Sequence, residues 1–188
     1  MKCEVRKNII MKKNKIKPKV LIIDVDGVLS TGQFFYTDKG KTMKIFGPDD
    51  NDGLSLLKPY IEIRFLTGDK KGFKISKKRV VDDMKFPLDL VSTIKRIEWI
   101  SEKYPLHKVI YMGDGIFDHY VFKKVGYSIS PSNGDELAKK FASYVTKHTS
   151  GNRAVAEACL HILKKFFKSY NPDKLPKSKV KMSGEWTV

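Results

Sequence analysis

The sequence predicts an α/β fold of the doubly wound kind, in which helices cover both faces of a parallel sheet. Short apolar segments typical of buried strands alternate along the chain with segments of helical periodicity. Several of these apolar segments run straight into Asp, Thr or Gly, as strands do when they end at a ligand site. A length of 188 residues suits one domain with a full-sized core.

The first predicted strand is the apolar run at 20–23, which is followed at once by Asp24, Asp26 and Gly27. Because side chains alternate along a strand, we expect the two carboxylates to point the same way. Two like charges held together repel, and a divalent cation between them makes the arrangement tolerable. An ordinary polar junction between a strand and a loop is the alternative interpretation.

A β-hairpin is predicted directly after this motif, with strands at 33–36 and 42–46 and a turn at 38–40. We expect it to stand over the strand end as a flap, and a surface hairpin without a role in the site is the alternative. The acidic, turn-rich stretch 47–52 then leads into a short helix at about 53–58. Its acids are candidates for capping that helix.

The second core strand is predicted at 61–66, and Thr67-Gly68-Asp69 closes it. The Thr67 hydroxyl and the backbone N–H groups at this strand end suit a phosphate oxygen. A Lys-rich helix at about 70–80 and a short third strand at 84–88 come next. Apolar residues at every third position predict an amphipathic helix over 91–103.

The clearest later strand is 108–112, which runs into Gly113 and Asp114 and so repeats the order of the first motif. The carboxyl ends of parallel strands share one edge of a sheet, so we expect Asp24, Thr67 and Asp114 to meet there. The remaining elements are predicted as helix 116–124, strand 127–129, helix 135–141, strand 143–145 and helix 152–168.

Three carboxylates, from Asp24, Asp26 and Asp114, together with phosphate and water oxygens, match the octahedral oxygen shell that Mg²⁺ prefers. Such a cation neutralises a phosphate and aligns it with a nucleophile. Asp24, nearest the strand, is the predicted nucleophile, which forms an aspartyl-phosphate. Asp26 is the predicted acid–base, which protonates the leaving alkoxide and then activates water.

The formal charge of +16 suggests nucleic acid or an anionic membrane as a partner, but the charge lies mainly at the two ends. We expect a basic leader at 1–18, a phosphatase domain at 19–168 and a basic tail at 169–188. No membrane partner is expected, and binding of nucleic acid is not favoured. Two distant cysteines and the lack of a signal peptide or a membrane-length apolar run predict a cytoplasmic protein.

The sequence resembles the haloacid dehalogenase (HAD) superfamily of phosphotransferases, whose DxDG signature appears at 24–27. It is more similar to the capless sugar-acid group, which contains 3-deoxy-manno-octulosonate 8-phosphate and acylneuraminate 9-phosphate phosphatases. The resemblance covers about residues 19–165. It rests on DVDGVLSTG at 24–32, Gly40, Lys44 and Phe46 in the hairpin, TGD at 67–69, GDGIFD at 113–118, KKVGYSISPSN at 123–133 and SGNRAVAEA at 150–158.

The resemblance implies a Mg²⁺-dependent phosphomonoesterase that works in lipopolysaccharide or sialic acid biosynthesis and assembles as a homotetramer. A neighbouring subunit then helps to close a site that has no cap domain. The implied roles are nucleophile for Asp24, acid–base for Asp26, phosphate contact for Thr67 and metal ligation for Asp114 with Asp24 and Asp26. Gly68 and Asp50 are predicted to contact the substrate.

One departure from the family pattern concerns a lysine at the start of the helix before the second motif, because no lysine stands in that register here. Lys95 is the predicted substitute and Lys85 is an alternative, and a solvated helix lysine is the plain interpretation of both. The departure motivates a second hypothesis, a weakly active domain that assists assembly or regulation in sugar-nucleotide synthesis. The basic ends motivate a third, a nucleic-acid end phosphatase.

Overall fold

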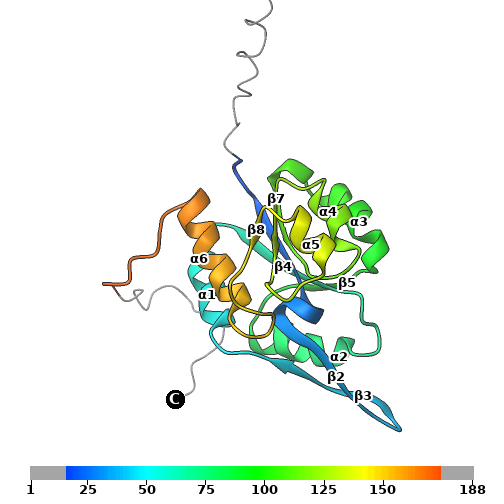
Figure 1. Cartoon of the computed structure of the whole chain (residues 1–188). Coiled ribbons are helices and arrows are strands. Elements are labelled where there is room, and N and C mark those ends of the chain that lie inside the picture. Colours follow the sequence, from blue (N-terminus) through cyan, green and yellow to red (C-terminus); the bar gives the residue numbers. More distant parts are fainter. Residues whose placement is uncertain (1–15, 175–188) are drawn as a thin grey trace, which may run out of the picture.

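A computed structural model describes residues 16–174, which form a six-stranded sheet, a two-stranded hairpin and flanking helices (Figure 1). The strand order is β5-β4-β1-β6-β7-β8, and all neighbouring strands in it are parallel. The strands are β1 (Val20–Asp24), β4 (Glu62–Thr67), β5 (Leu88–Leu90), β6 (Val109–Met112), β7 (Tyr127–Ser130) and β8 (Tyr144–Val145).

Helices cover both faces of this sheet, so the predicted doubly wound fold is confirmed. In Figure 1, α1 (Asp50–Leu57) and α6 (Ala154–Phe166) lie on one side of the sheet. On the other side lie α3 (Arg96–Lys103), α4 (Asp118–Phe122) and α5 (Glu136–Phe141). No separate cap domain is present among the described residues.

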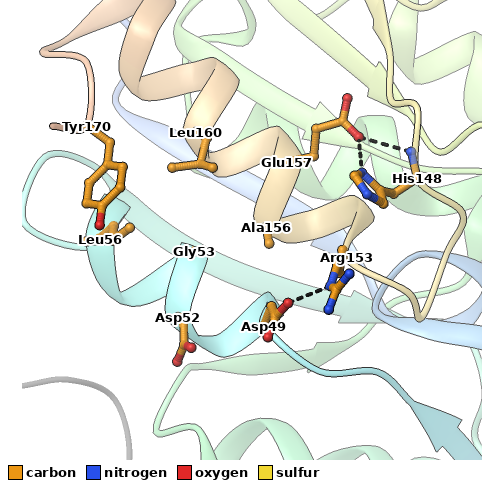
Figure 2. Close-up of a pocket in the computed structure, with 10 residues that line it drawn as sticks. All are labelled: Asp49, Asp52, Gly53, Leu56, His148, Arg153, Ala156, Glu157, Leu160 and Tyr170. Atoms are coloured by element: carbon orange, nitrogen blue, oxygen red, sulfur yellow. Dashed lines mark hydrogen bonds and ion pairs between the residues drawn. The ribbon is translucent and has the colours of Figure 1, made fainter. Parts of the chain in front are cut away.

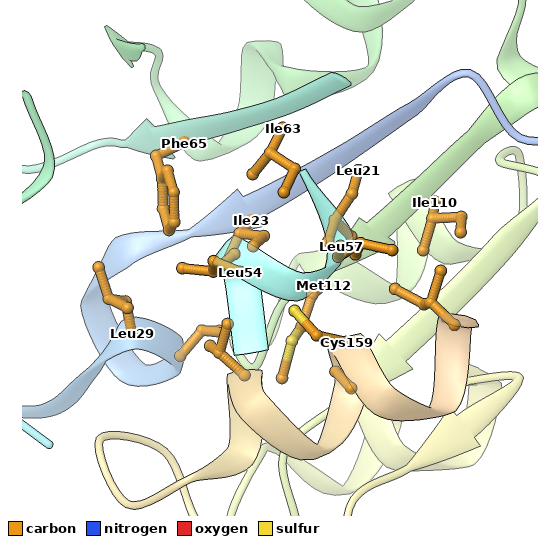
Figure 3. Packing of buried hydrophobic residues seen from close by; sticks show 14 of the residues in the cluster. Leu21, Ile23, Leu29, Leu54, Leu57, Ile63, Phe65, Ile110, Met112 and Cys159 are labelled. Carbon is orange, nitrogen blue, oxygen red and sulfur yellow. The ribbon is translucent and has the colours of Figure 1, made fainter. Parts of the chain in front are cut away.

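The central strand β1 is buried on both faces, which explains why its residues 20–23 are all apolar. Its alternate side chains enter two different cores: Val20 and Ile22 pack in the cluster beneath α3 and α4, and Leu21 and Ile23 pack in the cluster beneath α1 and α6. All four are fully buried. Figure 3 shows the second cluster, in which the helices close over the strands. A strand buried on both faces in this way is held firmly, and so is the residue at its end.

The predicted hairpin is present but begins three residues earlier, with β2 (Ser30–Thr37) pairing antiparallel to β3 (Gly40–Phe46). It extends beyond the sheet next to α2 (Phe73–Lys77) (Figure 1). Several large apolar side chains on it are exposed, among them Phe35, Tyr36 and Met43.

Two further predicted elements differ in extent from the observed ones. The helix expected at 70–80 begins at Phe73, as α2, and continues as a π-helix over Lys78–Asp83. The strand expected at 84–88 begins only at Leu88, in β5. Lys85 has a φ of +61°, which is not extended, and Pro87 has no N–H to donate to a neighbouring strand. The ladder therefore starts after the proline.

The expected leader 1–18 and tail 169–188 lie outside the described residues, apart from 16–18 and 169–174. None of the helices within residues 16–174 combines the length and the apolar character needed to cross a bilayer. The fold described here is therefore the core domain alone.

Candidate active site

The residues that follow three adjacent strands surround one cleft of about 340 Å³. Asp24 is the last residue of β1, Thr67 is the last residue of β4, and Asp114 follows β6. As predicted, the strand ends meet at one edge of the sheet. The cleft is lined by Asp24, Asp26, Phe34, Lys41, Gly68, Asp69, Thr93, Arg96, Asp114, Gly115 and Asp118.

A tight turn over Val25–Leu29 positions the first motif. Asp24 Oδ1 accepts a hydrogen bond from Val25 N at 2.8 Å, so the carboxylate is fixed by its own backbone. Gly27 has a φ of +87°, a conformation that favours glycine. A Cβ on Gly27 would also lie 2.1 Å from Asp114 Oδ2, so the missing side chain lets the two motifs touch.

Arg96, at the first position of α3, supplies the cation beside the predicted nucleophile. Its Nη1 donates to Asp24 Oδ2 at 2.7 Å and to Asp118 Oδ1 at 3.0 Å, and it lies 2.5 Å from the Tyr111 hydroxyl. The side chain is 3% exposed. Sequence reasoning missed Arg96, although Ile100 one turn later is fully buried and marks the same face of α3 as the inner one.

Three carboxylates form a group that could hold a metal ion. One oxygen each from Asp24, Asp114 and Asp118 lie within 4.8 Å of one another. Burial, followed by the charges of Asp24 and Asp118, raises the pKa of Asp114 to about 8. Burial also raises the pKa of Asp24 to about 6, although Arg96 opposes that shift. One guanidinium does not balance three carboxylates, and hard oxygen donors in this number suit Mg²⁺.

This metal group differs from the predicted one, which contained Asp26 and not Asp118. Because the strand ends at Asp24, the alternation that was expected to align both carboxylates does not continue. Asp26 Oδ1 lies 2.6 Å from Lys44 Nζ, and Asp26 Oδ2 accepts a hydrogen bond from Thr67 Oγ1 at 2.8 Å. The sequence signal for Asp118 was its place four residues after Asp114, in the first turn of α4.

In the structure the hydroxyl of Thr67 donates to Asp26 Oδ2, and its predicted contact with phosphate stays a prediction. Thr67 is fully buried, and its Oγ1 also accepts from the Asp69 N–H at 3.1 Å. Gly68, predicted to contact the substrate, does line the cleft. Of the two, Gly68 is the one whose backbone faces the space that a substrate would enter.

Two further predicted site residues, besides Thr67, are absent from the cleft lining. The Lys95 side chain is 65% exposed and pairs with Glu98 at 2.7 Å, since it points to the solvent side of its turn. Asp50 is 2% exposed and accepts the Ala156 N–H at 2.9 Å, near the start of α6. Asp50 therefore stabilises the contact between α1 and α6. The alternative Lys85 is exposed beside β5 and is likewise absent from the lining.

The hairpin contributes two lysines that sequence reasoning did not assign to the site. Lys41 lines the cleft, pairs with Asp69 Oδ2 at 2.5 Å and lies 3.3 Å from the centre of the Phe34 ring. Lys44 reaches Asp26 from the same strand. The hairpin is thus connected to the site by charge pairs, which favours the flap interpretation over a surface hairpin.

A second hollow of about 330 Å³ lies between α1 and α6 (Figure 2). Leu56 and Tyr170 lie at one end, and the ion pair between Asp49 Oδ2 and Arg153 Nε lies at the other. Within residues 16–174, the group of acids suited to a metal ion lies in the cleft at the strand ends and not here. The first cleft is therefore the candidate active site.

Comparison with known proteins shows the family to which the chain is similar. Residues 91–159 match a family model described as haloacid dehalogenase-like hydrolase. The chain is 32% identical over 162 residues to 3-deoxy-D-manno-octulosonate 8-phosphate phosphatase KdsC of Escherichia coli K12. The aligned segment covers 81% of each protein.

Solved structures of similar proteins carry metal ions. One is the 3-deoxy-D-manno-octulosonate 8-phosphate phosphatase of Moraxella catarrhalis, in complex with magnesium, phosphate and KDO. It matches with a TM-score of 0.68 and 28% sequence identity, and the match covers 79% of this chain and 87% of that one. The cobalt-bound phosphatase of Haemophilus influenzae has a TM-score of 0.70 and 26% identity, covering 81% and 91%.

Proposed function

This chain belongs to the haloacid dehalogenase-like hydrolases and is a phosphatase, and from that premise we propose that it hydrolyses a small phosphorylated sugar acid with the help of Mg²⁺. The proposed substrate is of the 3-deoxy-octulosonate 8-phosphate or acylneuraminate 9-phosphate type. The observation that carries the proposal is the meeting of Asp24, Asp114 and Asp118 within 4.8 Å at the strand ends. The bound magnesium, phosphate and KDO in the Moraxella catarrhalis relative support it.

In the proposed mechanism, an Asp24 carboxylate oxygen attacks phosphorus and the bond from phosphorus to the leaving oxygen breaks. Asp26 gives a proton to that oxygen, which leaves as an alcohol. Asp26, now a carboxylate, takes a proton from water, which attacks the aspartyl-phosphate and releases phosphate and free Asp24. Asp24, Asp114 and Asp118 would hold Mg²⁺, which supplies positive charge to the phosphoryl oxygens when bound.

Arg96 has two proposed functions in this mechanism. Its contact with Asp24 Oδ2 keeps one carboxylate oxygen fixed, so that the nucleophile has a defined direction. Its charge also offsets part of the repulsion between Asp24 and Asp118. In the family pattern that the sequence resembles, a lysine holds the nucleophile, and we propose that Arg96 takes the place of that absent lysine. We therefore favour the enzyme hypothesis.

The hairpin supports the proposal of assembly. Phe35 is 47% exposed, Tyr36 61% and Met43 55%, and an apolar ribbon of this kind is stabilised when a second copy covers it. We propose a homotetramer in which a neighbouring subunit helps to close the cleft, and a cytoplasmic location. Size measurement by light scattering tests the assembly.

A phosphate-release panel with Mg²⁺ tests the substrate class. It compares phosphorylated sugar acids, the corresponding neutral sugar phosphates and an oligonucleotide with a terminal phosphate. The proposal predicts that sugar-acid phosphates give the highest kcat/KM, and that Asp24→Asn releases no phosphate. Preference for the oligonucleotide would favour the end-phosphatase hypothesis. An active enzyme with no preference for the acids would contradict the proposed substrate.

A further inference from the structure

Lys44 is a buried lysine whose three partners are all in or next to the active site. Its side chain is 0% exposed. The ammonium donates to Ser76 Oγ at 2.8 Å and pairs with Asp69 Oδ2 at 2.9 Å. It also lies 2.6 Å from Asp26 Oδ1, as an ion pair and not a directed hydrogen bond. These partners hold the buried ammonium in place, because moving it away would leave largely buried carboxylate charge without its partner.

The two oxygens of Asp26 therefore have separate partners. Thr67 Oγ1 donates to Oδ2 at 2.8 Å from the end of β4, and Lys44 contacts Oδ1 from the hairpin. The Asp26 side chain is 17% exposed, so it still reaches the cleft. Its orientation is thus set by one group from the sheet and one from the hairpin.

The side chain of Lys44 packs closely against the backbone at Gly72. A Cβ added to Gly72 would lie 2.2 Å from Asp69 Oδ2, 2.7 Å from Lys44 Cε and 2.9 Å from Lys41 Cδ. The hairpin lysines therefore pack directly on the backbone before α2. Asp69 in turn accepts the Gly72 N–H at 3.0 Å, which holds this acid between the two lysines.

From this geometry we propose that Lys44 is a positioning residue, which acts on the reaction through Asp26. It holds the carboxyl group against Thr67 and stabilises the negative charge that develops on Asp26 as the proton passes to the leaving oxygen. Lys44 does not line the cleft, so it does not need to touch the substrate. The inference rests on the proposed function, in which Asp26 is the acid.

Dependence on the leaving group separates this role from a structural one. An alkoxide needs a proton to leave, whereas p-nitrophenolate does not. The value of kcat/KM reports the first phosphoryl transfer, so it is compared for an alkyl phosphate and for p-nitrophenyl phosphate. We expect Lys44→Met to lower the alkyl value by about 10²-fold, at the lower end of what general acid catalysis contributes, and the aryl value by only a few-fold.

The matched control is Lys39→Met, which removes an exposed lysine from the turn of the same hairpin. It should leave both values unchanged. A merely structural role of Lys44 would lower both values by the same factor, and that result would overturn the proposal.

Ser76→Ala provides a second variant that keeps the lysine. Ser76 is fully buried and outside the cleft lining, and it contacts the Lys44 ammonium. We expect a several-fold loss of kcat/KM that again falls mainly on the alkyl phosphate. An unchanged ratio of the alkyl to the aryl value would overturn the proposal even if Lys44→Met does not fold.

The wild type is measured first. An inert wild type would refute the proposed function and the inference with it, while an active wild type with unchanged ratios in the variants refutes the inference alone.

Discussion

Nη1 of Arg96 lies 2.7 Å from Oδ2 of Asp24, although 72 residues separate the two in the chain. The pair joins the end of β1 to the start of α3 and is almost completely buried. One guanidinium nitrogen, Nη1, contacts Asp24, Asp118 and Tyr111. The positive charge of Arg96 therefore lies between the two carboxylates.

Removing this cation should damage the enzyme strongly. Arg96→Met leaves the Asp24 carboxylate buried without its partner, and we expect a loss of about 3–5 kcal/mol in unfolding free energy, as for other broken buried pairs. The same change should lower kcat/KM for p-nitrophenyl phosphate by about 10²-fold or more. Urea unfolding and steady-state kinetics measure the two effects.

Lys95→Met is the control, because that side chain is 65% exposed, and its stability and kcat/KM should be near those of the wild type. The reverse ranking would show that Lys95 is the working cation.

Magnesium should stabilise the folded protein through the three acids. We expect Mg²⁺ to raise the Tm of the wild type, because it binds the folded state and not the unfolded one. Asp114→Asn should abolish this shift. Without Mg²⁺, the same variant should melt above the wild type, because burial and the charges of Asp24 and Asp118 disfavour ionised Asp114.

Differential scanning fluorimetry with EDTA and with Mg²⁺ measures both effects. Asp38→Asn, an exposed change in the hairpin turn, is the control, and an unchanged Mg²⁺ response of Asp114→Asn would exclude Asp114 as a ligand.

Gly27 should not tolerate a side chain. In Gly27→Ala the new Cβ would lie 2.1 Å from Asp114 Oδ2, so the Asp114 carboxylate must move and activity should be lost. Gly40 is the matched control, because its φ is +104° but an added Cβ meets no atom within 4 Å. Gly40→Ala should cost only the backbone strain of about 1–2 kcal/mol and keep its kcat/KM. Equal activity in both variants would contradict the close contact of the motifs.

Asp50 should make the stability of the fold depend on pH. Burial raises the pKa of Asp50 from 3.8 to about 6, so between these values the folded protein keeps a proton that the unfolded chain has lost. Stability then falls as pH rises from about 4 to about 6, by about 3 kcal/mol at most for a shift of this size. In Asp50→Asn this term is absent. We predict that the stability of the variant relative to wild type increases over that pH range and is constant above it, as measured by urea unfolding. A constant difference across the whole range would contradict the raised pKa.

The order and type of the main elements could be predicted because the local signals agree with the tertiary structure. The apolar runs at 20–23 and 109–112 lie in buried strands, and an acid of the site follows each within two residues. The convergence of Asp24 and Asp114 followed from the rule that parallel strands end at one edge. The strand near Pro87 was misplaced because Lys85, two residues before the proline, adopts a positive φ. The sequence does not indicate that conformation.

The site could be predicted only as far as the motifs reached. Arg96, Lys41 and Lys44 were missed because a charged residue on a helix or hairpin is usually solvated, and only the packing of α3 and of β3 turns these inward. Asp50 was assigned to the substrate because it stands beside other acids, whereas its buried carboxylate binds the backbone of α6. Long-range partners decide such cases, and a single sequence does not contain them.

Asp24 is proposed to become phosphorylated during turnover, and the decisive experiment is to trap that intermediate. Asp26→Asn is mixed with p-nitrophenyl phosphate and Mg²⁺, quenched in acid and analysed by peptide mass spectrometry. Because p-nitrophenolate leaves without a proton and the second step lacks its base, we predict a phosphoryl group on the peptide that contains Asp24, together with a matching burst of p-nitrophenol. A burst without phosphorylated Asp24, or a phosphoryl group on another residue, would contradict this account.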